Sequence, residues 1–258
     1  MRRVRFRDSE GTIRSGELIE EANEGATRAK AGLTGRVVVS DDTFPVAEID
    51  VLAPSEPSKI VCVGLNYADH AEEQGKELPD RPLLFLKGPN AVASHGEEVE
   101  LLAGVERIDH EAELGVVMGE RATGLGAETA MDAVAGFTCV NDLSNRDDQR
   151  VEQNWVRGKA FDGAAPMGPV LATPEEVPAD AAVRLRLNGE TRQESTRDRF
   201  VFSVPELIEE ITAYVTLEAG DVIATGTPAG VGPLHDGDRV EVEVEGVGTL
   251  SNTVSTPE

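Results

Sequence analysis

The sequence predicts a mixed, mainly β fold with a few short helices. Short apolar runs dominate the chain, and most of them end at Gly, Pro, Asn or Asp. Few stretches show the 3.6-residue apolar repeat of a helix, and strands do not alternate regularly with helices as in a parallel α/β sheet. The 258 residues are enough to bury a full core without disulfides or structural metals.

The first part of the chain is expected to be a small β-rich N-terminal extension, residues 1–55, followed by the main domain, residues 56–258. The boundary is a Pro-rich, linker-like segment at 54–57. At the start of the chain, apolar residues alternate with arginines, which favours an edge strand over a signal peptide. The residues of this pattern are Val4 and Phe6 among Arg3, Arg5 and Arg7.

Several short elements are predicted in the main domain. Apolar runs indicate strands, and two capping patterns indicate helices, a weak one at Thr129 and Asp132 and a stronger one at Ser203 and Glu206. The predicted strands are 60–63, 83–86, 137–140, 221–224 and a C-terminal pair at 240–244 and 249–254, and one or two helical turns are predicted at 66–74. The first capped helix is expected to stop at Gly136. The second is expected to carry a core stripe and to close at Gly220, its stripe being Leu207, Ile208, Ile211, Tyr214 and Val215.

The net charge of −24 argues against a general nucleic-acid binder, because such proteins need a basic face. Only five of the 24 basic residues are lysines, and Asp and Glu number 48. This composition is typical of a protein from a salt-rich cytoplasm, where salt screens the self-repulsion of an acidic surface. An ordinary acidic enzyme is the alternative.

The two cysteines, Cys62 and Cys139, lie inside apolar strand-like runs and form no metal-binding motif. We interpret them as buried thiols of a protein in a reducing compartment. Neither a signal peptide nor a membrane span is predicted, so the expected location is the cytoplasm, without a membrane partner.

Three carboxylates give the strongest functional signal. Glu111 and Glu113 stand two residues apart beside an apolar run, so a strand would place both side chains on one face. Asp142 ends a second apolar run. Hard oxygen ligands converging from strand ends suit Mg²⁺ or Mn²⁺. The alternative is two solvated acids and a turn aspartate.

His70 and Glu73 are three residues apart and would share one face of a helical turn. A carboxylate that orients a histidine raises its basicity, which makes a general base able to deprotonate water. A structural histidine is the alternative.

Three further segments can bind a substrate. Arg146 can clamp a carboxylate and Gln149 can donate to a carbonyl oxygen, unless they belong to a solvated loop. Lys159, among apolar residues, can stabilise an enolate, unless its stem covers apolar surface while its head stays hydrated. The Gly-rich segment 225–232 lets the backbone approach a ligand, with Thr227 as the contacting side chain, unless it is a plain turn.

Taken together, these segments resemble the fumarylacetoacetate hydrolase family from about Lys59 to Val254. No single motif is specific, but their order and spacing are. The motifs are Gly64-Leu-Asn-Tyr-Ala-Asp-His70, His110-Glu-Ala-Glu-Leu-Gly115, Asn141-Asp142 with Arg146 and Gln149, Gly158-Lys-Ala-Phe-Asp162, Pro166-Met-Gly-Pro169 and Gly220-Asp-Val-Ile-Ala-Thr-Gly-Thr-Pro-Ala-Gly230.

The resemblance implies a β-sandwich roll, a homodimer and one Mg²⁺ or Mn²⁺ per subunit. It implies metal ligands at Glu111, Glu113 and Asp142, a water-activating dyad of His70 and Glu73, and a cationic stabiliser at Lys159. It also implies substrate contacts from Arg146, Gln149 and Thr227, and a lid in the segment after His70.

One position departs from the founding hydrolase, because Val63 stands where that enzyme has a fourth acidic ligand. The chain therefore resembles the three-carboxylate subgroup, which acts on small 2-oxo acids. The predicted function is metal-dependent C–C hydrolysis of an acylpyruvate-type 2-oxo acid through an enolate. The alternatives are an isomerase, decarboxylase or dehydratase on the same site, or a non-catalytic metal- or ligand-binding protein.

Overall fold

The computed structural model describes residues 1–20, 33–73 and 75–257. The predicted mainly β architecture is confirmed, and most strands belong to one large sheet. Its strand order is β4-β3-β2-β1-β14-β12-β11-β17-β6-β7, with β5 beside β1 and β8 beside β14. These strands are β1 (Arg2–Arg7), β2 (Ile13–Ile19), β3 (Arg36–Val39), β4 (Asp42–Pro45), β5 (Asp50–Leu52), β6 (Ile60–Gly64), β7 (Leu83–Lys87), β8 (Val92–Ala93), β11 (Ala112–Met118), β12 (Val134–Asn141), β14 (Ala165–Ala172) and β17 (Val222–Ala224).

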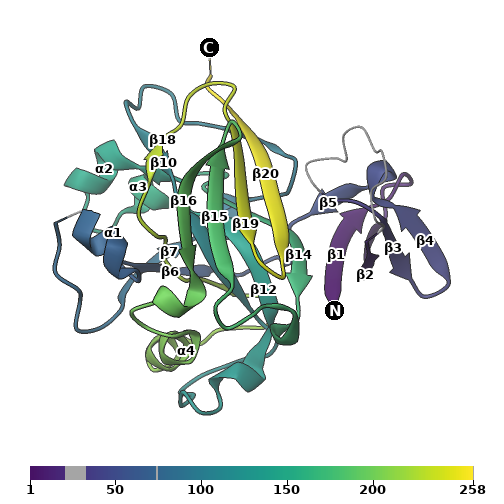
Figure 1. Cartoon of the computed structure of the whole chain (residues 1–258), viewed down its shortest axis with the longest axis horizontal. Coiled ribbons are helices and arrows are strands. Elements are labelled where there is room, and N and C mark those ends of the chain that lie inside the picture. The colour runs from purple at the N-terminus through teal and green to yellow at the C-terminus, as the bar shows by residue number, and fades with distance from the viewer. Residues whose placement is uncertain (21–32, 74, 258) are drawn as a thin grey trace.

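A second sheet packs on the centre of the first and closes the core. Its order is β16-β15-β19-β20-β9, and β15, β19 and β20 contact β11, β12 and β14 (Figure 1). The strands are β9 (Glu98–Glu100), β15 (Ala182–Leu187), β16 (Glu190–Thr196), β19 (Arg239–Val244) and β20 (Gly248–Ser255). Alternating valines of β19 face the buried layer, while its glutamates face outward, as the sequence pattern predicts.

A small third sheet and four short α-helices complete the described part of the fold, and α4 packs against the 3₁₀ turn that precedes β12. The sheet has the order β13-β10-β18. Its strands are β10 (Ile108–His110), β13 (Ser144–Asn145) and β18 (Gly232–Pro233), and the helices are α1 (Ala68–Glu73), α2 (Arg146–Val151), α3 (Val156–Lys159) and α4 (Val204–Thr212). None of the helices in the described ranges has the length and apolar character needed to cross a bilayer.

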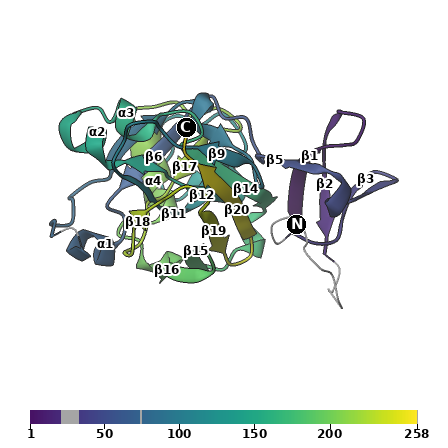
Figure 2. The ribbon, with the colours of Figure 1, turned by 90° about the horizontal axis from the view of Figure 1, so that it is seen from above.

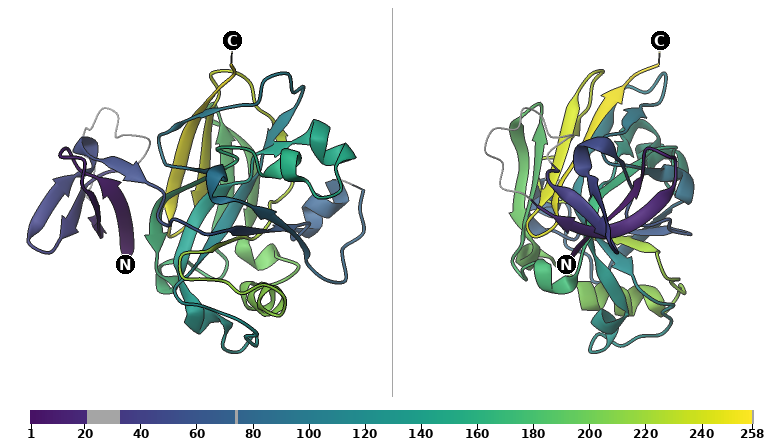
Figure 3. Two further views of the ribbon diagram at one scale, coloured as in Figure 1. Left: turned by 180° about the vertical axis from the view of Figure 1, so that it is seen from behind. Right: turned by 90° about the vertical axis from the view of Figure 1, so that its right-hand side faces the viewer.

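Strands β1 to β5 form a lobe at one side of the molecule (Figure 2). The N-terminus lies in this lobe, and the C-terminus follows β20 at one end of the main body (Figure 3). The prediction that β1 is an edge strand was wrong, because β1 pairs with β2 on one side and with β14 and β5 on the other. An internal strand with one solvated face shows the same alternation as an edge strand. The division at residue 55 stays a prediction.

The predicted strands of the main domain correspond to β6, β7, β12, β17, β19 and β20, and the helical turns correspond to α1. Gln74, at the end of that predicted turn, lies outside the described residues. Cys62 and Cys139 are buried free thiols, as expected.

The helix predicted to start at Thr129 was wrong. Residues Ala130–Ala133 make only one 3₁₀ turn, without a side-chain cap, and β12 begins at Val134. Gly136 lies inside β12, where a Cβ atom would come within 2.3 Å of the Ala172 carbonyl oxygen. This glycine therefore permits the close approach of β14 and does not end a helix.

The second capped helix is confirmed as α4. Glu206 Oε2 accepts hydrogen bonds from the backbone N–H and the hydroxyl group of Ser203, at 2.7 and 2.6 Å. The predicted stripe extended too far, because α4 ends at Thr212 and Tyr214 is 70% exposed. Tyr214 contacts the Arg81 guanidinium at the surface, 5.4 Å from the ring centroid.

The two predicted caps provide a matched pair for a stability test. Ser203→Ala should lower the free energy of unfolding by about 1 kcal/mol, because it removes a capping-box partner. Thr129→Ala should change it by less than about 0.5 kcal/mol, because Thr129 caps no helix. Urea unfolding followed by circular dichroism measures both, and equal losses would contradict the assignment of the caps.

Candidate active site

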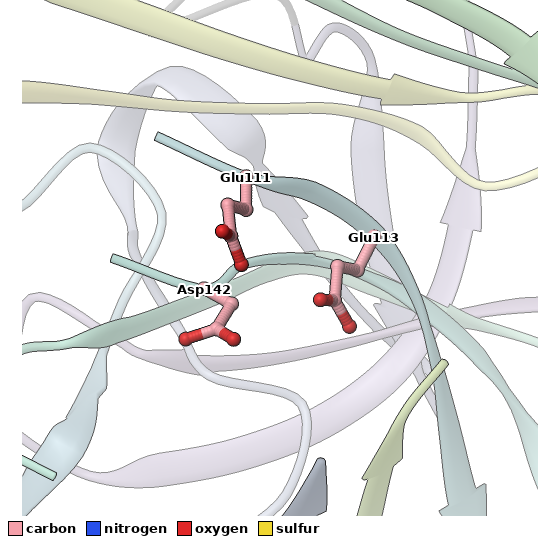
Figure 4. A group of neighbouring side chains, drawn as sticks. All are labelled: Glu111, Glu113 and Asp142. Carbon is pink, nitrogen blue, oxygen red and sulfur yellow. The ribbon is translucent and has the colours of Figure 1, made fainter. Parts of the chain in front are cut away.

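Three carboxylates meet where β11 begins and β12 ends. Glu111 precedes β11, Glu113 is the second residue of β11, and Asp142 directly follows β12. The register pairs Ala112 with Asn141, so Asp142 lies beside the two glutamates. One oxygen from each carboxylate lies within 4.8 Å of the others, and no more than 5% of each residue is exposed. Figure 4 shows the three carboxylates turned toward one another.

Buried cations compensate two of these carboxylates. Lys159 Nζ donates to Glu111 Oε2 at 2.8 Å and to Asp142 Oδ2 at 2.7 Å, and Arg146 Nη2 donates to Glu111 Oε1 at 2.5 Å. Burial raises the pKa of Glu111, but Lys159 and Arg146 outweigh burial and hold this pKa below its ordinary value. Burial lowers the pKa of Lys159, but Asp142 and Glu111 outweigh it and raise this pKa. Lys159 is therefore an ammonium ion here, and its head is buried against acids of the site instead of lying at the surface.

Glu113 has a different environment. Its Oε2 accepts the backbone N–H of Gly226 at 2.8 Å. Burial raises the pKa of Glu113 well above its ordinary value, and the negative charges of Asp142 and Glu111 raise it further. A bound divalent cation would counter both effects and suits three close carboxylate oxygens. The three residues thus fit the implied metal ion.

Lys87, at the end of β7, is a site residue that was not predicted. Its Nζ lies 2.6 Å from Asp142 Oδ1 and donates to the carbonyl oxygens of Leu143, Ala164 and Lys159, at 3.2 and 2.9 Å for the first two. Only 1% of Lys87 is exposed. A signal existed, because a lysine directly after an apolar strand is unusual in a chain with few lysines.

The predicted pair of His70 and Glu73 is present on α1. His70 Nδ1 lies 3.2 Å from Glu73 Oε2, and His70 is buried. The Glu73 carboxylate also accepts the backbone N–H of Gly230 at 3.1 and 3.2 Å. The Gly-rich segment thus fixes the acid that orients the histidine.

The two donor glycines of this segment need their lack of a side chain. Gly226 has φ +95° and Gly230 has φ +98°, a region that disfavours other residues. A Cβ atom on Gly226 would come within 2.8 Å of Asn66 Cβ, and one on Gly230 within 2.1 Å of the Arg192 carbonyl oxygen. The segment is therefore not a plain turn, because it brings two backbone donors to two acids of the site.

Arg146 and Gln149 lie on α2 and belong to the site, not to a solvated loop. Arg146 Nε donates to Asp109 Oδ2 at 2.8 Å, and its Nη1 donates to Gln149 Oε1 at 2.7 Å. Together with its hydrogen bond to Glu111, these two hydrogen bonds fix the Arg146 guanidinium against other side chains of the protein. Asp109 is a further buried acid that the sequence analysis missed.

Gln193, on β16 of the second sheet, connects several parts of the site and was also missed. Its Oε1 accepts the Ala112 N–H at 3.0 Å and lies 3.2 Å from His110 Nδ1. Its Nε2 donates to Thr227 Oγ1 at 2.7 Å and to the Pro228 carbonyl oxygen at 2.8 Å. Gln193 thereby ties the strand that carries Glu113 to the Gly-rich segment.

All nine predicted site residues except Glu73 line one pocket, and Glu73 contacts it through His70. Val63, which stands in place of a fourth acid, lines it too. The lining residues are Val63, Gly64, Leu65, His70, Lys76, Leu83, Phe85, Glu111, Glu113, Asp142, Arg146, Gln149, Trp155, Lys159 and Thr227.

With this geometry established, comparison with known proteins decides the family. Residues 59–255 match the model of the fumarylacetoacetate (FAA) hydrolase C-terminal domain. The chain belongs to the fumarylacetoacetate hydrolase family. The match covers the residues that build the pocket and leaves the β1–β5 lobe outside it.

Members of this family with named activities are similar over most of the chain. Oxaloacetate tautomerase YisK of Bacillus subtilis is 42% identical over 82% of this chain and 75% of its own length. A 5-carboxymethyl-2-hydroxymuconate delta-isomerase structure from Mycobacterium smegmatis matches with TM-score 0.87 and 35% identity over 100% of both chains. A 2-hydroxyhepta-2,4-diene-1,7-dioate isomerase structure from Mycobacterium marinum matches with TM-score 0.86 and 34% identity, covering 99% of this chain and 98% of that one.

The position of Gln193 leads to a stability prediction. Gln193→Leu should lower the free energy of unfolding by about 2–4 kcal/mol, because it leaves several buried hydrogen-bonding groups without a partner. Gln153→Leu, at an exposed position, is the matched control and should stay within about 0.5 kcal/mol of the unaltered protein. Chemical unfolding measures both changes, and a neutral Gln193→Leu would refute the connecting role.

Proposed function

We propose that this protein is a metal-dependent enzyme that interconverts the keto and enol forms of a small 2-oxo acid, as a tautomerase or isomerase. The buried cluster of Glu111, Glu113 and Asp142, in one pocket with His70, carries this proposal. Cation-binding oxygens and a base in one pocket are what removal of a proton next to a 2-oxo group requires. The named tautomerase and isomerase relatives support it.

In this proposal Glu111, Glu113 and Asp142 hold one Mg²⁺ or Mn²⁺. The bound ion would supply Lewis-acid stabilisation of the negative charge that develops on the 2-oxo group. Both ions take carboxylate oxygens, so the three acids suit either metal.

His70 serves as the base. Glu73 holds the Nδ1 side of the ring, so Nε2 takes the proton from C3 of the keto acid, and the oxygen of the resulting enolate takes a proton from solvent to give the enol. The same two transfers in reverse return the keto acid. Gly230 holds Glu73 in turn, which keeps the ring in one orientation. An oriented base of this kind contributes about 10²–10⁴-fold to the rate.

Four other side chains prepare the site for an anion. The Lys159 ammonium contributes positive charge where the enolate forms. Arg146 and Gln149 contact the carboxylate end of the substrate, and Thr227 Oγ1 is fixed by Gln193 at the pocket wall. The close contacts of Lys159 and Arg146 with acids of the site keep these cations in place before substrate binds.

The direct test follows the conversion of enol oxaloacetate to its keto form by ultraviolet absorbance, with Mg²⁺ and with or without a chelator. The expected result is an acceleration of at least about 10²-fold over the solution rate, lost on chelation and restored by excess Mg²⁺. An acceleration that the chelator does not change would contradict the metal-dependent site.

Hydrolysis of a C–C bond is the second candidate, and the geometry of His70 and Glu73 favours it. The same pair can deprotonate water, which then attacks the distal carbonyl of an acylpyruvate. Pyruvate release from a short acylpyruvate in molar KCl with Mg²⁺ distinguishes the two functions. Chelator-sensitive release supports hydrolysis, and fast enol conversion without release leaves the tautomerase function.

Replacement of Glu113 tests the metal ligands. Glu113→Gln should abolish measurable Mg²⁺ and Mn²⁺ binding and catalysis without unfolding the protein, because the substituted amide is a weaker ligand and carries no charge. Glu98→Gln, at an exposed residue of β9, is the control and should bind metal normally. Calorimetric titration measures metal binding, and circular dichroism measures folding. An unaltered metal affinity in Glu113→Gln would contradict this assignment of the metal ligands.

Replacement of His70 separates metal binding from proton transfer. His70→Ala should keep the metal affinity within about twofold and lower kcat by about 10²–10⁴-fold. Glu73→Gln should give a smaller loss, because the base is present but less well oriented. If His70→Ala retains full tautomerase activity, another group is the base.

We also propose a homodimer in a reducing cytoplasm of high salt. Exposed apolar residues on β7 and α3, Leu86 at 55% and Val156 at 58%, support a contact with a second copy. The two buried free thiols support a reducing compartment, and the low lysine content with excess acids supports high salt. Light scattering in low and molar KCl tests the oligomer and its salt requirement together.

A further inference from the structure

The side chain of Arg146 lies between two buried acids, Glu111 and Asp109. Its Nη2 donates to Glu111 Oε1 at 2.5 Å, and its Nε donates to Asp109 Oδ2 at 2.8 Å. Glu111 lines the pocket of the three carboxylates, whereas Asp109 lies behind Arg146, is 1% exposed and does not line that pocket. The protein therefore buries a further carboxylate, at a cost, next to a residue that contacts substrate in the proposed mechanism.

The third sheet determines the position of Asp109. Asp109 is the middle residue of β10 and pairs with Ser144 of β13 on one side and with Pro233 of β18 on the other. The backbone N–H of Arg146 donates to the Arg107 carbonyl oxygen at 2.9 Å, which continues this pairing into the first residue of α2. The start of α2 is thus fixed beside β10, where the Arg146 side chain reaches Asp109.

Two arginines contact Asp109 in different ways. Arg107 uses the Nε and Nη2 edge of its guanidinium to bind both oxygens of Asp109, at 2.7 and 3.1 Å. This bidentate geometry is the one that arginine favours with a single carboxylate. Arg146 divides the same edge between two carboxylates, with Nε on Asp109 and Nη2 on Glu111. Arg146 therefore gives Glu111 one hydrogen bond instead of two.

This division affects how much of Glu111 is left for a metal ion. Lys159 Nζ donates to Glu111 Oε2 at 2.8 Å, and Arg146 donates to Oε1. The proposed metal ion needs an oxygen of the same carboxylate. If Arg146 turned its whole edge to Glu111, it would donate to both oxygens and compete with the ion. Asp109 accepts the Nε hydrogen and thereby opposes that rotation.

The same contact fixes the direction in which Arg146 faces the substrate. Burial lowers the pKa of Arg146, but the charge of Glu111 and the hydrogen bond to Asp109 outweigh burial and raise it, so the side chain stays charged. Its Nη1 donates to Gln149 Oε1 at 2.7 Å. Counted over the described residues, three of its five N–H groups bind protein acceptors, and the other two can donate to a substrate oxygen.

We propose that Asp109 is a positioning residue, which holds Nε of Arg146 away from Glu111 so that Glu111 can bind the metal ion and Arg146 can face the substrate. This inference rests on the proposed function and adds to it a residue outside the pocket of the three carboxylates. Asp109 acts through Arg146 and contacts neither the metal ion nor the reacting atoms.

Metal titration tests this role without catalysis. Asp109→Asn should weaken Mn²⁺ binding about tenfold in isothermal titration calorimetry, because a neutral amide with one acceptor oxygen cannot hold both arginines, and loss of a group that orients a metal ligand has an effect of this size. Asp180→Asn, at an exposed residue, is the control and should bind Mn²⁺ normally. Circular dichroism measures the folding of both variants. A folded Asp109→Asn variant with unaltered Mn²⁺ affinity would overturn the proposal.

A double-mutant cycle shows whether Asp109 acts through Arg146. In the Arg146→Gln background, Asp109→Asn should change the Mn²⁺ affinity by less than about twofold, because no guanidinium is left to turn toward Glu111. The same tenfold loss in both backgrounds would mean that Asp109 attracts the ion by its charge alone, and the positioning role would be refuted.

Arg107→Gln provides a second variant, at a side chain that is 44% exposed and can be replaced without disturbing the core. It leaves Asp109 to Arg146 alone, so the Mn²⁺ affinity should stay the same or rise. A loss as large as about tenfold would contradict the proposal. This measurement decides the question even if Asp109→Asn does not fold.

Steady-state kinetics with oxaloacetate and saturating Mg²⁺ provide a further readout. Asp109→Asn should raise KM more than it lowers kcat, because the substrate contact of Arg146 moves while His70 stays in place. A large loss of kcat with unaltered KM would contradict the positioning role. If the unaltered protein binds Mn²⁺ but does not convert oxaloacetate, the proposed function fails and the titrations still decide the role of Asp109. A protein that binds no Mn²⁺ would overturn both.

Discussion

The burial of three carboxylates at one point is the constraint on which the rest of the site depends. An isolated buried charge costs several kcal/mol, so the surrounding structure must compensate it. Lys159, Lys87 and Arg146 provide that compensation from α3, β7 and α2, and β7 is distant in the sequence from the two helices. Glu113 is left with a backbone donor and a raised pKa, which is why the cluster is suited to a cation from solution.

Backbone N–H groups and the side-chain amide of Gln193 hold these residues in place. The segment that follows β17 supplies N–H donors to Glu113 and Glu73, and two glycines with positive φ make its path possible. Gln193 reaches this segment from the opposite sheet. The sandwich therefore does more than bury a core, because the contact between its sheets fixes the distance between the acids and the base.

The local features of this protein were predictable from its sequence, and the long-range ones were not. The two-residue spacing of Glu111 and Glu113 and the three-residue spacing of His70 and Glu73 fix neighbours through strand and helix geometry alone. Lys87 lies 55 positions from Asp142 and Gln193 lies 34 positions from Thr227, so only the folded chain brings these residues together. That the remaining site residues lie together was predicted only from the family resemblance.

The errors have similar causes. Pairing with β14 places Gly136 in β12, although the local sequence pattern predicted a helix. Strand β1 is internal, but it has one solvated face, so its sequence pattern resembles that of an edge strand. The polar segment at the end of β12 suggests a solvated loop, but residues 141–145 are buried, and Ser144 and Asn145 pair with β10 in the third sheet. Local sequence composition does not indicate which surfaces are buried by other parts of the fold.

The central claim is that Glu111, Glu113 and Asp142 together bind a divalent cation. The most direct measurement is anomalous X-ray diffraction from a crystal of the protein soaked in Mn²⁺. The expected result is one strong anomalous peak among the three carboxylates. A peak at another position with this cluster empty, or no peak under conditions where the protein is active, would contradict the claim.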